Sequence, residues 1–434
     1  MRQSSSNSSL RLSLSLAAVA VVLRPTNLIV WLGILALALT RMTLDGTSPL
    51  QWESLVVLFR EIILCGSGVL TVSLLSDRYY FGFWTFPPYK FLYFNISQSL
   101  AVFYGHMPWH YYLSQGLPLL STTFLPFVLV GLWKSTTSLP RNSVRQSNTL
   151  KALSFTVLTM VGTLSVISHK EVRFIYPLLP ILHILAAPYL VLFFTVPPSE
   201  PSDAPAALSP SGSPRTILRH KVSLANILSI NILLAGYLSV LHQPAPISVL
   251  NFLRTDFERV HVDSLTIGGA ANVTQPDELF ALFLTPCHST PWRSHLVYAG
   301  LRARALTCEP PLHTAPGSVE RREYLDEADR FYAEDPTTGQ YGLKFLAEEM
   351  WPVVATDTEG VRRGGEIPRY IIGFEQIGPL LQQFFDGEDA PGKGMGVKLT
   401  KVWAGWNGLF NEDWRRRGSL VVWATGIYPD SPES

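Results

Sequence analysis

The sequence of 434 residues is apolar for its length, because 47% of its residues are hydrophobic and only 15% are charged. This composition excludes a single ordinary soluble domain and indicates a membrane part joined to a soluble part. The formal net charge of +1, with no basic patch interleaved with aromatic residues, gives no support to nucleic-acid binding.

Apolar segments fill the first half of the chain, and about seven of them approach the length of a membrane span. A span needs roughly 20 apolar residues, so the first two segments are expected to be tilted, broken or paired as a hairpin around Arg24-Pro25-Thr26. No small-residue cleavage site follows the first segment, which favours a membrane helix over a cleaved signal peptide. The predicted segments are 10–23, 27–40, 54–75, 116–133, 151–168, 174–195 and 222–241.

Basic residues in two loops predict the orientation of these spans. The loop 134–151 carries four cations and no acid, and the Pro/Ser-rich loop 196–221 also has an excess of cations. Both are predicted to be cytoplasmic by the positive-inside rule. The charged stretch 169–173, the loop 77–115 and everything after residue 241 then face the opposite side, which is the lumen in an endoplasmic reticulum protein.

The remainder of the chain, 242–434, has a soluble composition and is predicted to be a lumenal α/β domain. One helix is expected in 343–354. Strands are expected in LFALFLTPCHST, SHLVYAGLRARALTCEPP, RYIIGF, VKLTKVWAGW and SLVVWATG. The predicted domains are therefore a multispan membrane domain, 1–241, and an α/β domain, 242–434.

The stretch SHKEVRFIYPLLP places four ionisable side chains, His169, Lys170, Glu171 and Arg173, directly before an apolar run. Charges are costly near hydrocarbon, so this cluster is either a solvated turn that anchors two helices or part of a site. Lys170 and Arg173 suit a phosphate group, which Arg binds bidentately. Glu171 and His169 would then orient these cations or handle a proton.

A second stretch, SDRYYFGFWTFPPYKFLYFN, is unusually rich in aromatic residues. It is either an interfacial aromatic belt with a short re-entrant helix or a groove for a lipid tail or sugar rings. If the stretch forms such a groove, Arg78 would lie near a phosphate.

The three cysteines give little evidence of a catalytic or metal site. Cys65 is expected to be a small buried hydrophobe, and Cys287 and Cys308 would pair if their domain faces an oxidising lumen. No cysteine spacing predicts a zinc site, so no metal is expected. The candidate N-glycosylation acceptors are Asn95 and Asn272.

Several blocks resemble a known family. HKEVRFIYPLLP resembles the His-Lys-Glu-x-Arg-Phe signature of the dolichol-phosphate-mannose-dependent mannosyltransferases of glycosyltransferase family 22. Further blocks resemble the branch of that family that acts on glycosylphosphatidylinositol (GPI) precursors: RPTNLIVW, SDRYYFGFWTFPPYKFLYFN, FYGHMPWHYYLSQGLP, LTPCHSTPWRSHLVY and YLDEADRFYAEDP.

The resemblance implies a GT-C-like polytopic membrane protein of the endoplasmic reticulum with a lumenal active site. Its reaction would move mannose from dolichol-phosphate-mannose to the second mannose of a GPI precursor, making an α1,2 link with inversion. No cofactor is expected beyond this donor, and the partners would be the two glycolipids and membrane lipids. The implied donor-phosphate residues are His169, Lys170, Glu171 and Arg173, and those of a second block, a lipid or substrate groove, are Asp77, Arg78, Tyr79, Gly82 and Trp84.

The family pattern also contains several spans and an acidic lumenal motif before the Arg-Pro-Thr block, and this motif supplies the catalytic carboxylate. The sequence begins almost at that block, so we expect a chain truncated relative to the family, and no residue here is assigned as the catalytic carboxylate. The alternative is a catalytically inactive fragment that binds lipid or glycan in the membrane.

Overall fold

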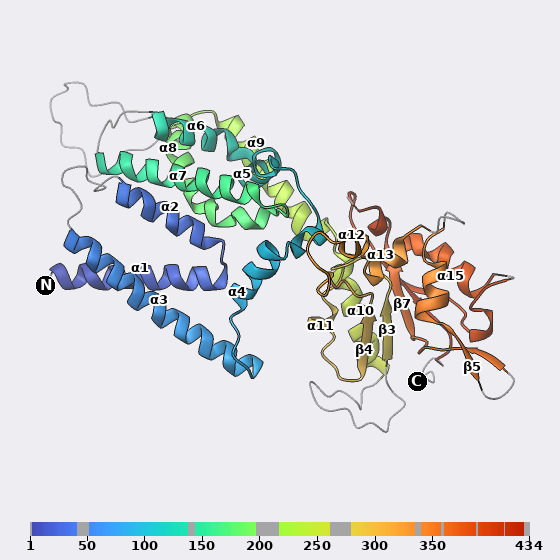
Figure 1. Cartoon of the computed structure of the whole chain (residues 1–434). Coiled ribbons are helices and arrows are strands. Elements are labelled where there is room, and N and C mark those ends of the chain that lie inside the picture. Colours follow the sequence, from blue (N-terminus) through green and yellow to red (C-terminus); the bar gives the residue numbers. More distant parts are fainter. Residues whose placement is uncertain are drawn as a thin grey trace. The chain divides into compact units, whose positions relative to one another are not determined.

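The chain folds into two compact units, Met1–Ile232 and Leu233–Ser434, in the computed structural model (Figure 1). The division falls within helix α9 (Lys221–Gly236), earlier than the predicted domain boundary after residue 241. The structure describes residues 2–40, 52–137, 144–196, 217–260, 279–334, 340–356, 360–387, 389–411 and 413–428.

The first unit is helical because its sequence is a series of long apolar runs. Among the described residues, five helical runs are long and apolar enough to cross a membrane, and two shorter ones precede and follow Arg24. The five are Trp52–Phe81, Tyr112–Thr137, Gln146–Val166, Val172–Phe194 and Lys221–Val260. Its main helices are α1 (Arg2–Leu23), α2 (Asn27–Thr40), α3 (Trp52–Phe81), α6 (Leu125–Thr137), α7 (Val144–Val166) and α8 (Leu179–Phe194).

Short elements connect these helices. Proline residues begin or interrupt several of them, as expected for a residue that lacks a backbone N–H. The short elements of the first unit are α4 (Pro87–Leu92), η1 (Tyr93–Ser97), η2 (Leu100–Tyr104), η3 (Tyr112–Gly116), α5 (Leu117–Ser121), η4 (Thr122–Phe124), η5 (Val172–Leu178), β1 (Thr195–Val196) and β2 (Ile217–Leu218). η6 (Tyr237–Leu241) follows α9 in the second unit.

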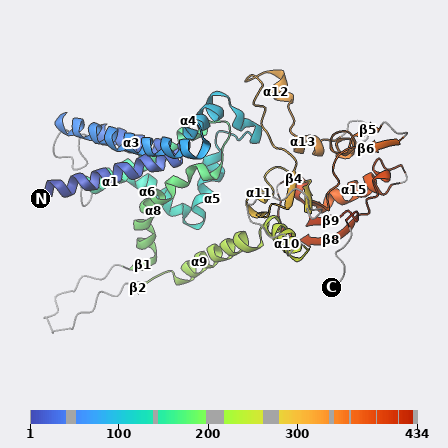
Figure 2. The same cartoon turned by 90° about the horizontal axis from the view of Figure 1, so that it is seen from below.

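The core of the first unit lies where α2, α6, α7 and α8 pack together around Tyr112, Met160 and Leu182. Gly131 allows α6 to approach α8 closely, because a Cβ atom there would lie 2.4 Å from the carbonyl oxygen of Leu185. Outside this core, α1 packs along α3 (Figure 2).

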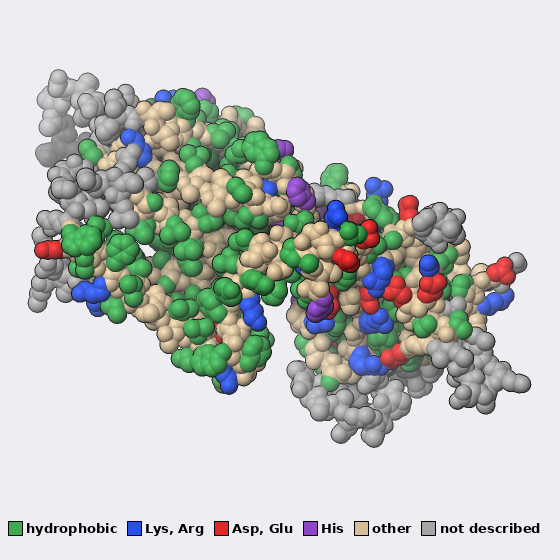
Figure 3. Space-filling view, in the orientation of Figure 1, with side chains coloured by type: hydrophobic (Ala, Val, Ile, Leu, Met, Phe, Trp, Pro, Cys, Tyr) green, Lys and Arg blue, Asp and Glu red, His purple; other side chains and the backbone are tan. Residues whose placement is uncertain are grey.

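The outer surface of this unit is apolar, and on the face in Figure 3 hydrophobic side chains cover its helices. Side chains such as Ile63 and Val72 are more than two-thirds exposed, although nothing in their chemistry favours water. Such a surface is stable in hydrocarbon, so the unit is a multispan membrane part.

The second unit is built on a mixed five-stranded sheet with the strand order β4-β3-β7-β9-β8. β3 is parallel to both β4 and β7, whereas β9 is antiparallel to β7 and β8. All five predicted strand regions contain a strand, and the predicted helix is present as α14 and η8. The strands are β3 (Leu279–Phe283), β4 (Leu301–Ala305), β7 (Tyr370–Phe374), β8 (Thr400–Gly405) and β9 (Leu420–Ala424).

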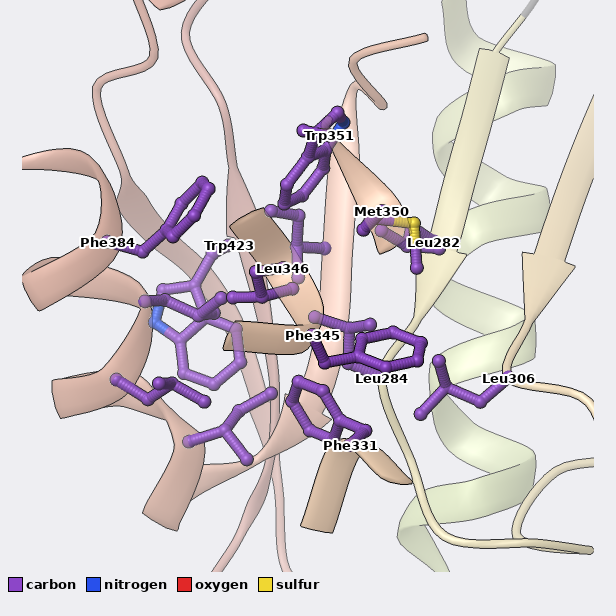
Figure 4. Close-up of a cluster of buried hydrophobic side chains, with 14 of the residues drawn as sticks. Leu282, Leu284, Leu306, Phe331, Phe345, Leu346, Met350, Trp351, Phe384 and Trp423 are labelled. Carbon is purple, nitrogen blue, oxygen red and sulfur yellow. The ribbon is translucent and has the colours of Figure 1, made fainter. Parts of the chain in front are cut away.

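Two hydrophobic clusters cover the two faces of this sheet. α10 (Ala245–Val260) packs on one face, where Leu250, Phe257 and Phe283 are buried. On the other face Phe331, Trp351 and Phe384 fill a core whose side chains meet in Figure 4. The elements of this unit outside the main sheet are α11 (Trp292–His295), α12 (Val319–Glu323), α13 (Glu327–Tyr332), α14 (Leu343–Phe345), η8 (Leu346–Met350), β5 (Val353–Thr356), β6 (Gly360–Arg363), η9 (Glu375–Ile377), α15 (Gly378–Phe385), η10 (Lys393–Met395) and η11 (Trp414–Arg416).

Candidate functional site

The charged turn, residues 168–173, joins the end of α7 to the start of η5 in the first unit. The backbone N–H of Met107 donates to the carbonyl oxygen of Ser168 across 3.0 Å, so the turn is held against the 105–107 segment. Glu171 has an extended backbone (φ −137°, ψ 148°), and it marks the point where the chain leaves the turn for η5. Two separate family-like blocks of the sequence are therefore neighbours in space.

His169 is held by two oxygen acceptors. Its Nδ1 lies 2.9 Å from the carbonyl oxygen of Gly105, and its Nε2 lies 3.0 Å from Oε1 of Glu171. The two contacts fix the position and the plane of the imidazole ring. Gly105 has φ 130°, a backbone region that a residue with a Cβ adopts only under strain.

Lys170 is buried, with 3% of its surface exposed, and its Nζ donates to the carbonyl oxygen of Met107 across 3.1 Å. Burial lowers the pKa of its ammonium group, because desolvation disfavours the charged form. Lys170 thus fastens the charged turn to the 105–107 segment, and its ammonium does not line the pocket described below.

Glu171 and Arg173 form a two-point ion pair. Nη2 of Arg173 donates to Oε1 of Glu171 across 2.7 Å, and its Nε pairs with Oε2. Burial raises the pKa of Glu171, but hydrogen bonds from Arg173 and His169 outweigh this effect and lower it overall. Arg173 is 62% exposed, so its guanidinium remains accessible while Glu171 fixes its orientation.

A cavity of about 390 Å³, which we call the arginine pocket, brings Arg173 together with Arg24. Its walls come from the turn between α1 and α2 (22–26), from Pro87, Pro88 and Phe91 of α4, and from Arg173 and Phe174 of η5. The hydroxyl Oγ1 of Thr26 is buried and has no hydrogen-bond partner among the described residues. The pocket combines two cations with mainly apolar walls.

The second candidate block lies at the C-terminal end of α3, separate from this pocket. Tyr79 and Trp84 are 93% and 67% exposed, and Asp77 is half-buried. Arg78 donates to the carbonyl oxygen of Gly82, so it caps its own helix end. Within the described ranges, no hydrogen bond or ion pair joins these five residues to the charged turn.

The structure describes one of the two candidate glycosylation acceptors. Asn95 lies in η1, where its Nδ2 donates to the carbonyl oxygen of Phe91 across 2.7 Å. It also lines a cavity of about 240 Å³ together with Ser168 and His169. Asn272 lies outside the described residues.

In the second unit, Cys287 and Cys308 form a disulfide at the carboxyl ends of β3 and β4. Oδ2 of the buried Asp326 lies 3.3 Å from Sγ of Cys287. These three residues are close enough to hold a metal ion, but sulfurs joined in a disulfide offer no thiolate ligand. The cluster is therefore structural.

Sequence reasoning did not assign a site role to Arg24 or Thr26, which it placed only in a turn between two short spans. The signal that could have indicated them is the family-like block RPTNLIVW, whose arginine stands at a predicted membrane boundary. Their approach to Arg173 depends on tertiary packing that no local pattern encodes.

Known proteins resemble the chain over most of its length. "GPI mannosyltransferase 3" of Gibberella zeae is 53% identical over 98% of this chain and 66% of its own length. The Aspergillus fumigatus protein of the same name is 39% identical over 95% of this chain and 52% of its own. "GPI alpha-1,2-mannosyltransferase 3" of Mus musculus is 32% identical over 73% of this chain and 47% of its own.

The chain thus spans about half to two-thirds of the length of these relatives. No solved structure matches it. The sequence model of the Alg9-like mannosyltransferases matches residues 1–297, which include the charged turn and every wall of the arginine pocket. The chain belongs to the Alg9-like mannosyltransferase family.

Proposed function

We propose that the chain is part of a GPI-anchor mannosyltransferase that moves mannose from dolichol-phosphate-mannose to the second mannose of a GPI precursor, with an α1,2 link. The observation that carries this proposal is the accessible guanidinium of Arg173, held by Glu171 in a cavity with mainly apolar walls. Support also comes from the names of the relatives, of which the mouse protein's specifies an α1,2 linkage.

In this mechanism the chain's own residues hold the departing dolichyl phosphate. Negative charge grows on the phosphate as its bond to mannose breaks, and a preorganised guanidinium stabilises that charge. Glu171 and His169 fix Arg173, and Lys170 fixes the charged turn against Met107. A carboxylate acting as base on the acceptor hydroxyl completes the inverting reaction, and we assign that role to no residue of this chain.

We place the protein in the membrane of the endoplasmic reticulum, with the second unit in the lumen. The excess of cations in the loops 134–151 and 196–221 supports this orientation. The disulfide between Cys287 and Cys308 also suits an oxidising compartment. The proposal includes no cofactor beyond the lipid-linked donor.

The test is transfer of radiolabelled mannose from dolichol-phosphate-mannose to a two-mannose GPI precursor by the complete enzyme that contains the chain, in nanodiscs. We expect Arg173→Gln to lower the rate by about 100-fold, the scale of losing one oxyanion-stabilising donor. Arg173→Lys should recover only part of the rate, because lysine lacks the bidentate fork. The control is Lys134→Gln, which removes an exposed cation at the end of α6.

Transfer by Arg173→Gln at the rate of the unsubstituted chain would contradict the proposed role of Arg173. Binding of dolichyl phosphate by the complete protein without transfer of mannose would favour the alternative, a lipid- or glycan-binding membrane protein.

A further inference from the structure

Three stretches that are far apart in the sequence meet at the arginine pocket. They are the turn after α1, the start of α4 and the start of η5, and they contribute Arg24, Pro87 and Arg173 respectively. None of the residues that line this cavity of about 390 Å³ is acidic. Packing of the first unit thus places two arginines around one cavity.

No contact in the described part of the chain occupies the guanidinium of Arg24. It makes no ion pair and no side-chain hydrogen bond there, in contrast with Arg11 and Arg60, which both pair with Glu61. A half-buried cation without an ion pair among the described residues is well suited to an anionic ligand. Arg173, whose fork Glu171 orients, is the second cation of this pair.

Thr26 provides an independent observation that points to a ligand. Its hydroxyl is buried and has no partner in the described ranges, although buried polar atoms nearly always have one. Thr26 lines the arginine pocket, so a ligand oxygen in this cavity would satisfy the hydroxyl.

The remaining walls indicate what the anion is attached to. Leu23, Pro87, Phe91 and Phe174 present apolar surface beside the two arginines. A free phosphate would leave that surface in contact with water, whereas an anion carried on a hydrocarbon chain would cover it.

We propose that Arg24 and Thr26 form, together with Arg173, a binding pocket for the phosphate of a lipid. The Arg24 and Arg173 guanidiniums bind phosphate oxygens from two sides, and Thr26 donates its hydroxyl to a third contact. This inference rests on the proposed function, because it adds Arg24 and Thr26 to the donor-phosphate site. The dolichyl phosphate of the donor and the phosphodiester in the phosphatidylinositol of the acceptor are both phosphates carried on a lipid, so the test separates them.

The experiment measures binding of radiolabelled dolichyl phosphate and of phosphatidylinositol to the chain in phosphatidylcholine nanodiscs. The variants are Arg24→Gln, Arg24→Lys, Thr26→Val and Arg173→Gln, with Lys134→Gln as the charge-matched control. Uncharged dolichol shows how much of the affinity belongs to the phosphate. Circular dichroism and thermal melting of each variant confirm that the chain remains folded.

We expect Arg24→Gln and Arg173→Gln each to weaken dolichyl phosphate binding by about tenfold or more, the scale of a lost hydrogen bond to a charged group. Arg24→Lys should weaken it less than Arg24→Gln, and Thr26→Val should weaken it several-fold. The same losses for phosphatidylinositol, with dolichyl phosphate unaffected, would support the pocket but assign it to the acceptor.

Normal binding of both lipids by Arg24→Gln, with weaker binding by Arg173→Gln, would overturn the pocket and leave the proposed function standing. Normal binding of both lipids by both variants would overturn the pocket and the donor-phosphate role of Arg173 together.

Discussion

Glu171 competes with any anion that binds Arg173, because its carboxylate already accepts two hydrogen bonds from that guanidinium. Its lowered pKa keeps the carboxylate ionised at pH values where an ordinary glutamate begins to protonate. A carboxyl whose folded-state pKa is depressed stabilises the fold above its unfolded pKa, and this contribution is lost as pH falls through the folded value. The ion pair is therefore intact at neutral pH.

We predict that Glu171→Gln binds dolichyl phosphate several-fold more tightly than the unsubstituted chain. The substitution removes the competing negative charge while keeping an oxygen that accepts from Arg173. Binding in nanodiscs at low and moderate salt measures the effect, and the exposed Glu53→Gln at the start of α3 is the control. Weaker binding by Glu171→Gln would mean that orienting Arg173 matters more than competing for it.

Lys170 shows the limit of what a local sequence pattern predicts about a single side chain. Locally, a lysine three positions before an arginine, both ahead of an apolar run, predicts two cations for one phosphate. In the structure the carbonyl oxygen of Met107 takes the ammonium, and the side chain is buried. Arg24, which lies on a distant segment, lines the same cavity as Arg173.

At the scale of elements, Asp326 connects the disulfide to the start of α13. Its Oδ1 accepts from the backbone N–H of Asp329 across 2.7 Å, the usual contact of a helix N-cap. Burial raises its pKa, despite the opposing effect of that N–H. The fold thus favours the protonated carboxyl, and its contribution to stability decreases as pH rises through the folded-state pKa.

We predict opposite effects for two substitutions of Asp326. Asp326→Asn keeps an acceptor for the cap without a charge to desolvate, so it should slow hydrogen exchange of α13 at pH 7 and have little effect near pH 4. Asp326→Ala removes the cap and should destabilise α13 by about 1 kcal/mol at both pH values. Hydrogen–deuterium exchange of peptides covering Glu327–Tyr332 distinguishes them, and faster exchange in Asp326→Asn at pH 7 would contradict the role of desolvation.

The elements themselves could largely be predicted, because they depend on local patterns. Apolar length alone predicts the helix that ends at Phe194, and short β-rich runs predict the strands β7 and β9. Sequence could not predict that α6 and α8 touch at Gly131, since this contact depends on the meeting of two separate surfaces. The arginine pocket could not be predicted for the same reason.

For the whole molecule, the proposed topology places the charged turn and the second unit on one side of the membrane. The runs Val172–Phe194 and Lys221–Val260 follow the charged turn and are each long enough to cross. Two crossings return the chain to the side it left, and the segment between them, 195–220, falls in the loop that is predicted to be cytoplasmic. Orientation is therefore a single binary property that one labelling experiment can decide.

We predict that Leu312→Asn acquires an N-linked glycan when the chain is made in the endoplasmic reticulum. Leu312 is 51% exposed in the second unit, and Thr314 stands two positions later, which completes an acceptor sequence. Ala207→Asn completes one with Ser209 in the loop predicted to be cytoplasmic, and it should remain unmodified. Both changes are made in a background of Asn95→Gln and Asn272→Gln, and mobility before and after endoglycosidase treatment gives the result. A glycan on Ala207→Asn but not on Leu312→Asn would invert the topology, and it would place the arginine pocket on the cytoplasmic side with the second unit.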